Sequence, residues 1–173
     1  MIIGMSVAAF TALHVVISLI GIVSGVVVLA AMLHGKAPAG WTALFLATTV
    51  LTSATGFLFP ATGFTPAQGV GILSLILLAI ALLALYGRHL AGAWRWVYVV
   101  TAVPALYFNC FVAVAQSFQK LPPLRALAPT QSEPPFQVAQ LVVLAIFIVA
   151  AIFAVRRFHP GRRPRVVFEA SMP

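Results

Sequence analysis

Acidic side chains are almost absent from this sequence. Its 173 residues contain only two, Glu133 and Glu169, against ten lysines and arginines. Neither carboxylate lies within a long apolar stretch, where pumps and ion-coupled transporters usually place their proton and ion relays. The sequence therefore disfavours a pump or a secondary active transporter and leaves a passive pore open.

Charge of either sign is scarce too. Charged residues make up 7% of the chain and hydrophobic residues 62%, whereas a soluble globular domain is about one quarter charged. This composition excludes a soluble globule and indicates an integral membrane protein. The net charge of +8 comes from basic residues at the ends of apolar stretches, as membrane topology requires. We therefore expect the lipid bilayer, and no nucleic acid, as a partner.

Cysteine is limited to Cys110, which excludes an intrachain disulfide and a thiolate metal cluster. The sequence also contains no Gly-rich phosphate loop and no catalytic motif. We predict no catalytic residue and no metal site, and the sequence gives little reason to expect an enzyme.

The chain does contain five long apolar stretches, each near or above the about 20 residues that cross a bilayer as a helix. Backbone polar groups find no water in hydrocarbon, so each stretch should be α-helical. The sequence thus predicts an all-α, polytopic membrane helix bundle. Its five transmembrane helices form one domain over residues 1–158, and a basic tail follows over residues 159–173. The predicted helices lie at about residues 8–33, 41–59, 69–87, 94–118 and 136–155.

The distribution of basic residues predicts the orientation of this bundle. Cytoplasmic loops of membrane proteins collect lysine and arginine. With the C-terminus in the cytoplasm, only Lys120 and Arg125 lie outside. The basic residues on the cytoplasmic side are then Lys36, Arg88, Arg95, Arg156, Arg157, Arg162, Arg163 and Arg165. We therefore predict an N-out, C-in topology, with the basic tail as a candidate contact for anionic lipid.

The loop over residues 119–135 is rich in proline, which favours a stiff outer flap without regular structure. At its end Ser132 is predicted to cap the last helix. Glu133 suits the positive end of that helix dipole and could alternatively admit a cation or accept a proton at the mouth of a site.

Polar residues within the apolar stretches fall mainly in the predicted outer half of the membrane. His14 and Ser18 share one stripe of the first helix with Gly21 and Gly25. Polar groups in lipid are costly, so this asymmetry predicts an outward-facing ligand pocket. The alternative is hydrogen bonding between helices that only holds the bundle together. The candidate ligand-binding residues are His14, Ser18, Thr52, Ser53, Tyr107, Asn109, Gln116 and Glu133.

His14 is the only histidine within an apolar stretch, so a b-type haem with two axial histidines from one chain is disfavoured. Two chains could each supply one ligand if the first helix dimerised through its glycine face. His14 could instead exchange a proton with a quinone, or simply bond Asn109 or a threonine.

Three functions remain open on these grounds. The first is a binding or accessory component with an outward-facing polar pocket, acting as a homo-oligomer or with a partner membrane subunit. The second is a membrane redox protein that binds haem or quinone. The third is a passive pore or small-solute transporter.

Residues 51–60 (LTSATGFLFP), 92–98 (GAWRWVY) and 128–136 (APTQSEPPF) carry a resemblance to known sequences. The chain resembles a group of small, uncharacterised, multi-pass bacterial inner-membrane proteins. The resemblance implies a bacterial inner-membrane location and brings no activity, cofactor or site residue with it.

Overall fold

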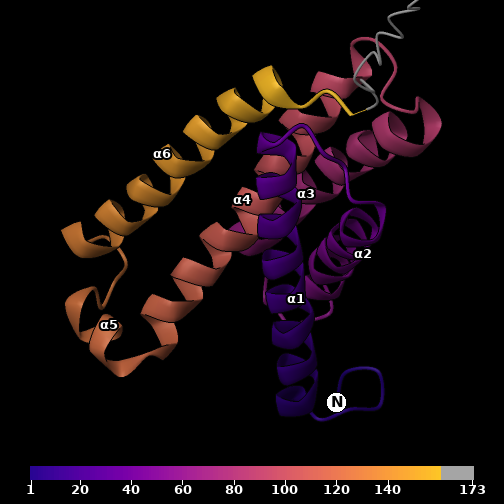
Figure 1. The fold of residues 1–173 in the computed structure, drawn as a ribbon. Helices are drawn as coiled ribbons and strands as arrows, with labels where there is room; N and C mark the ends of the chain where they lie inside the picture. Colours follow the sequence, from indigo (N-terminus) through magenta and orange to yellow (C-terminus); the bar gives the residue numbers. More distant parts are fainter. Residues whose placement is uncertain (161–173) are drawn as a thin grey trace, which may run out of the picture.

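The computed structural model describes residues 1–160, and over these residues the chain is all-α, with no strand (Figure 1). A long helix overlaps each of the five apolar stretches, although the second helix ends three residues before the predicted boundary. The elements are α1 (Val7–Leu33), α2 (Ala39–Gly56), α3 (Pro66–Leu82) with the π-helical turn η1 (Leu83–Gly87), α4 (Trp94–Lys120), α5 (Pro122–Leu127) and α6 (Pro134–Arg157). Arg162, Arg163 and Arg165 of the predicted tail lie outside the described residues.

Within the described residues, four helices are long and apolar enough to cross a membrane: α1, α3 together with η1, α4 and α6. They are compatible with a membrane protein. The shorter α2 is not among the four, because hydroxyl side chains lower the hydropathy of its 18 residues. These side chains are Thr42, Thr48, Thr49, Thr52, Ser53 and Thr55.

Local sequence signals explain where several helices begin. At the start of α1, the Ser6 hydroxyl accepts a hydrogen bond from the Ala9 N–H at 3.2 Å. Thr65 and Gln68 form a reciprocal capping box at the start of α3. Such caps satisfy N–H groups that have no partner within the helix.

The predicted loop over residues 119–135 differs from expectation in two respects. It contains the short helix α5, so the prediction of an entirely irregular flap is wrong. Proline at the first helical position needs no N–H partner, which explains why Pro122 starts this helix instead of preventing it. The cap of α6 is Glu133 and not Ser132, and its carboxylate bonds back into the loop instead of onto α6.

The helices form a body and an arm (Figure 1). The body consists of α1, α2, α3 and the first half of α4, with α2 packed between α1 and α3. The arm consists of the second half of α4, α5 and α6, and it slopes away from α1. Aromatic pairs hold the arm together, including Phe118 with Phe136 at 5.4 Å and Tyr107 with Phe147 at 5.7 Å between ring centroids.

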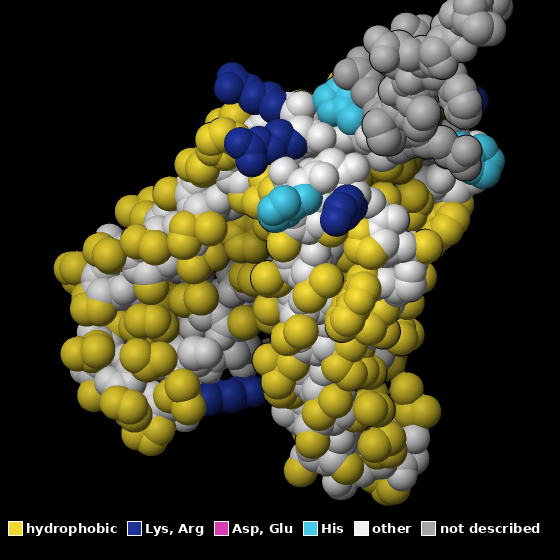
Figure 2. Space-filling view, in the orientation of Figure 1, with side chains coloured by type: hydrophobic (Ala, Val, Ile, Leu, Met, Phe, Trp, Pro, Cys, Tyr) yellow, Lys and Arg dark blue, Asp and Glu magenta, His cyan; other side chains and the backbone are white. Residues whose placement is uncertain are grey.

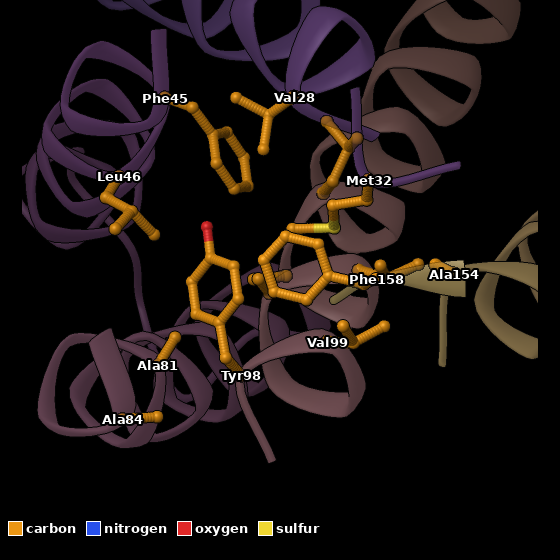
Figure 3. Packing of buried hydrophobic residues seen from close by; sticks show 14 of the residues in the cluster. Val28, Met32, Phe45, Leu46, Ala81, Ala84, Tyr98, Val99, Ala154 and Phe158 are labelled. Carbon is orange, nitrogen blue, oxygen red and sulfur yellow. The ribbon is translucent and has the colours of Figure 1, made fainter. Parts of the chain in front are cut away.

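The hydrophobic core lies where α6 ends against the body (Figure 3). Phe158, directly after α6, is 1% exposed, and its ring lies 5.8 Å from that of Tyr98 in α4. Met32 of α1 and Phe45 of α2 close the cluster. The arm is therefore fixed to the body at this end, which we call the basic end because Lys and Arg side chains gather there (Figure 2).

Candidate functional site

The close contact between α1 and α4 depends on two glycines. A Cβ atom on Gly21 would lie 3.4 Å from Asn109 Nδ2 and 3.2 Å from Thr48 Oγ1. A Cβ on Gly25 would overlap Leu106 and would lie 2.8 Å from the Phe45 ring. Small residues let helix backbones approach closely in this way. The glycine face of α1 is thus covered by α2 and α4 of the same chain.

Beyond these glycines, α4 runs away from α1 (Figure 1). Helical spacing places Ser18 and His14 on the same stripe of α1 as Gly21, toward the N-terminus. On α4, Gln116 lies seven residues after Asn109 and so shares its face. We call the space between these two diverging faces the wedge. Gly21 and Asn109 form its apex, and the space-filling view shows it as an open hollow between arm and body (Figure 2).

His14 is half-buried on the α2 side of the wedge. Its Nδ1 lies 2.8 Å from Thr55 Oγ1, and its ring meets that of Phe59 edge-on at 5.2 Å. The sequence-based hypothesis that His14 bonds a threonine is confirmed, with Thr55 as the partner.

The roles of the two His14 ring nitrogens depend on where Thr55 sends its single hydroxyl proton. The Thr55 hydroxyl can donate to the Leu51 carbonyl at 2.6 Å or to the Thr52 carbonyl at 3.3 Å. When it does so, Thr55 Oγ1 accepts from His14 Nδ1 and Nε2 is an acceptor. When it donates to Nδ1 instead, Nε2 carries the proton. Nε2 has no hydrogen-bond partner among residues 1–160 and is not among their buried unpaired atoms.

The other predicted residues on the wedge differ in their engagement. Ser18 donates to the His14 carbonyl at 2.7 Å within α1. Asn109 donates to Thr49 Oγ1 at 3.4 Å, a long bond at the apex. Gln116 is exposed and makes no hydrogen bond within the described residues. His14 and Ser18 thus lie on the α1 face of the wedge, and Asn109 and Gln116 lie on its α4 face.

Two other predicted residues lie away from the wedge. Ser53 is buried on the opposite side of α2 and donates to Ser74 of α3 at 3.1 Å. Tyr107 packs between aromatic rings of α4 and α6. Thr52, by contrast, shares a stripe of α2 with Thr48 and Thr55, which meet α1, and its buried hydroxyl has no hydrogen-bond partner in the described part of the chain.

Glu133 serves the loop before α6. Its carboxylate accepts from the Thr130 N–H at 3.1 Å, the Thr130 hydroxyl at 2.9 Å and the Ser132 N–H at 3.1 Å. Desolvation, the largest single effect, raises the pKa of this carboxyl, but the hydrogen bonds together outweigh it and hold the pKa below the ordinary value. The residue therefore acts as a structural anion in this loop.

Two polar contacts between helices were not predicted as pairs. Gln140 of α6 donates to the Phe111 carbonyl of α4 at 3.1 Å, and Gln131 donates to the Ala115 carbonyl at 2.7 Å. The acceptors are backbone groups of ordinary apolar residues, so side-chain type gave no signal for them. Both bonds hold the arm together.

A second hollow, of about 550 Å³, lies between α1 and α6. One α1 residue, Leu33, faces six residues of α6 there. The α6 residues are Ala145, Ile146, Val149, Ala150, Phe153 and Arg157. None of the predicted site residues lines this hollow.

Among residues 1–160, no group of three or more His, Cys, Asp or Glu side chains could hold a metal ion. The α1 glycine face is covered by α2 and α4 of the same chain, so two chains that shared a haem would have to meet through other surfaces. Oligomerisation through other surfaces stays a prediction.

No family model, curated protein or solved structure matches this chain. The resemblance to bacterial inner-membrane proteins therefore stays a prediction, and function has to be inferred from the geometry of the site.

Proposed function

We propose that this chain is a multi-pass protein of the bacterial inner membrane, with five transmembrane helices, its N-terminus outside and its C-terminus in the cytoplasm. It acts as a binding or accessory component through the wedge, which then opens outward. The observation that carries this proposal is the His14 ring, whose Nδ1 bonds Thr55 while its Nε2 has no partner in the described residues, on the face of α1 that borders the wedge. A polar group in lipid without a partner is costly, which favours a ligand that supplies hydrogen bonds there.

The inclusion of α2 as a fifth span rests on its length and its internal bonding. Its 18 residues extend about 27 Å at 1.5 Å per residue, close to the roughly 30 Å of the hydrocarbon core. Thr48 donates to the Leu44 carbonyl at 2.7 Å, and Thr55 can donate to that of Leu51. These bonds satisfy two of the six hydroxyl groups of α2 within the helix, so α2 is less polar than its composition indicates.

Cysteine labelling tests the topology. In a Cys110→Ala background, we expect Ala126→Cys in α5 to react with an impermeant maleimide on intact cells. Ala91→Cys, between η1 and α4, should react only after permeabilisation. Both positions are exposed alanines, so differences in access within the protein are small. The reverse pattern would overturn the orientation and place the wedge on the cytoplasmic side.

The ligand is a small amphiphile whose head group forms a hydrogen bond with His14 Nε2. Mass spectrometry of lipid extracts from gently solubilised protein identifies it. We expect a co-purified species that is lost in His14→Ala and reduced in Gln116→Leu. Ser53→Ala is the matched control, because it removes one interhelical hydrogen bond outside the wedge. Equal retention in all four proteins, or no bound species in any of them, would contradict the proposal.

A redox role is the second candidate, and one observation favours it. Histidines that ligate metals usually donate their other ring N–H to an oxygen, as His14 Nδ1 can to Thr55. The same arrangement leaves Nε2 free to bond a quinone or the iron of a haem. An absorption spectrum of the same preparation distinguishes these ligands. A Soret band or a co-purified quinone lost in His14→Ala would support this function, and a colourless, quinone-free preparation would refute it.

A further inference from the structure

The hollow between α1 and α6 has an apolar wall and one positively charged side chain at its rim. Its volume of about 550 Å³ falls in the range of small-molecule sites. Every lining side chain except Arg157 is apolar. The hollow is therefore suited to hydrocarbon, with a charged group at one end only.

The packing of α6 explains why the hollow stays open. Phe158 fixes the C-terminal end of α6 in the core, and Phe147 holds its middle against Tyr107 of α4. Toward α1, the helix presents the small residues Ala145 and Ala150. These alanines are too short to reach Leu33, so α1 and α6 leave space between them.

One cation lines the hollow, at its basic end. This is Arg157, with the guanidinium 5.4 Å from the Phe153 ring. A Cβ on Gly35 would lie 3.2 Å from the Arg157 carbonyl, so the turn after α1 contacts the end of α6. In Figure 2, Lys and Arg side chains stand at this end of the hollowed region between α6 and α1.

No protein anion neutralises this charge within the described residues. Glu133 is the only acidic residue among them, and it lies before the first turn of α6. The 24 residues of α6 place it about 36 Å from Arg157. Among the described residues no carboxylate is close enough to pair with Arg157, so the rim can accept an anionic group, and the apolar wall beneath it fits an anion that carries a hydrocarbon chain.

We infer that the α1–α6 hollow binds an anionic phospholipid. One acyl chain lies along Leu33, Ile146 and Val149, and the phosphate contacts Arg157. A basic residue near a membrane surface strengthens binding of anionic lipid about fivefold. Arg157 at the end of an apolar hollow therefore selects an anionic head group over a zwitterionic one with the same acyl chains.

Native mass spectrometry of the full-length protein tests this site. The protein is titrated with phosphatidylglycerol or with phosphatidylcholine of identical acyl chains. We expect preferential phosphatidylglycerol binding that falls about fivefold in Arg157→Gln. Arg156→Gln removes the same charge one residue away from the hollow, so it is the matched control and should have a smaller effect. Equal losses in the two variants, or equal binding of the two lipids, would overturn the inference.

A second pair of variants tests the apolar part. Ala150→Phe fills the hollow and should reduce phosphatidylglycerol binding, whereas Ala79→Phe adds the same bulk on an exposed face of α3 and should not. Unchanged binding in Ala150→Phe would show that the lipid is held by surface charge alone, which overturns the site. The Arg157→Gln result remains decisive if Ala150→Phe does not fold.

Discussion

The contact at Gly25 gives the sharpest test of the fold and of the wedge. Replacing Gly25 with alanine adds a Cβ that overlaps Leu106 and lies 2.8 and 2.9 Å from two atoms of the Phe45 ring. Real Cβ atoms essentially never approach other heavy atoms more closely than 3.0 Å. Leu106 and Phe45 are each 1% exposed, so neither can move aside without displacing other core residues. The helices α1 and α4 must therefore separate or strain.

The expected cost follows from opposing effects. Inserting one methyl into a packed core costs about 1–3 kcal/mol. Alanine is favoured over glycine within a helix by about 1 kcal/mol, which offsets part of that loss. Gly40→Ala is the matched control, because Gly40 lies in α2 with nothing within 4 Å of an added Cβ. The difference in the free energy of unfolding between the two variants isolates the effect of the overlap. We expect this free energy to be about 1–3 kcal/mol lower for Gly25→Ala than for Gly40→Ala.

The single cysteine provides the assay. Cys110 is half-buried in α4, directly after Asn109 at the apex of the wedge. A fluorogenic maleimide therefore labels it faster when the protein unfolds on heating. We expect a melting temperature a few degrees lower for Gly25→Ala than for Gly40→Ala. The melting temperature of Gly21→Ala should lie between those of the other two variants, because its added Cβ would lie no closer than 3.2–3.4 Å to its neighbours.

One result would refute this reasoning. If Gly25→Ala melts at the same temperature as Gly40→Ala, then α1 does not pack on α2 and α4 at this position. If the protein were a dimer in solution and Gly25→Ala made it a monomer with unchanged stability, the glycine face would instead form the contact between two chains. Either outcome would remove the apex on which the wedge depends.

Three further predictions concern other contacts. The His14–Thr55 hydrogen bond should contribute about 1 kcal/mol to the free energy of unfolding. A double-mutant cycle of His14→Ala and Thr55→Val measures this contribution as a coupling energy, and purely additive effects of the two substitutions would contradict the bond. Tyr98→Phe should leave the melting temperature unchanged or raise it, because its buried hydroxyl makes no hydrogen bond of normal geometry in residues 1–160, although the Thr42 hydroxyl lies nearby; a large loss would show that the two hydroxyls bond. Because the pKa of Glu133 is lower in the folded protein than its ordinary value of 4.5, the stabilising effect of its carboxylate is complete above that pH and is lost as pH falls through the folded value. The protection factors of amides in the loop before α6 should thus fall in acid, and Glu133→Gln should abolish that dependence.

The sequence by itself determined the class of the protein and the approximate positions of its helices. Long apolar stretches with charge only at their ends permit an all-α chain and little else, because the backbone must satisfy its own hydrogen bonds in hydrocarbon. The prediction that the loop over residues 119–135 lacks regular structure failed at Pro122, where α5 begins. Proline density alone does not distinguish an irregular loop from the start of a short helix. The span of α2 was predicted from its apolar run, although its threonines lower its hydropathy.

Only the tertiary structure decided which polar residues share a site. Ser53 and His14 are both polar residues of apolar helices, yet Ser53 faces α3 and His14 lies beside the wedge. That separation depends on how α4 diverges from α1 beyond Gly21, and helix crossing is set by the contact of whole side-chain surfaces. The hollow at Arg157 likewise depends on where Phe158 fixes the end of α6. Helical periodicity places a residue on a face of its own helix, but the neighbour that covers this face is chosen only when all the helices pack together.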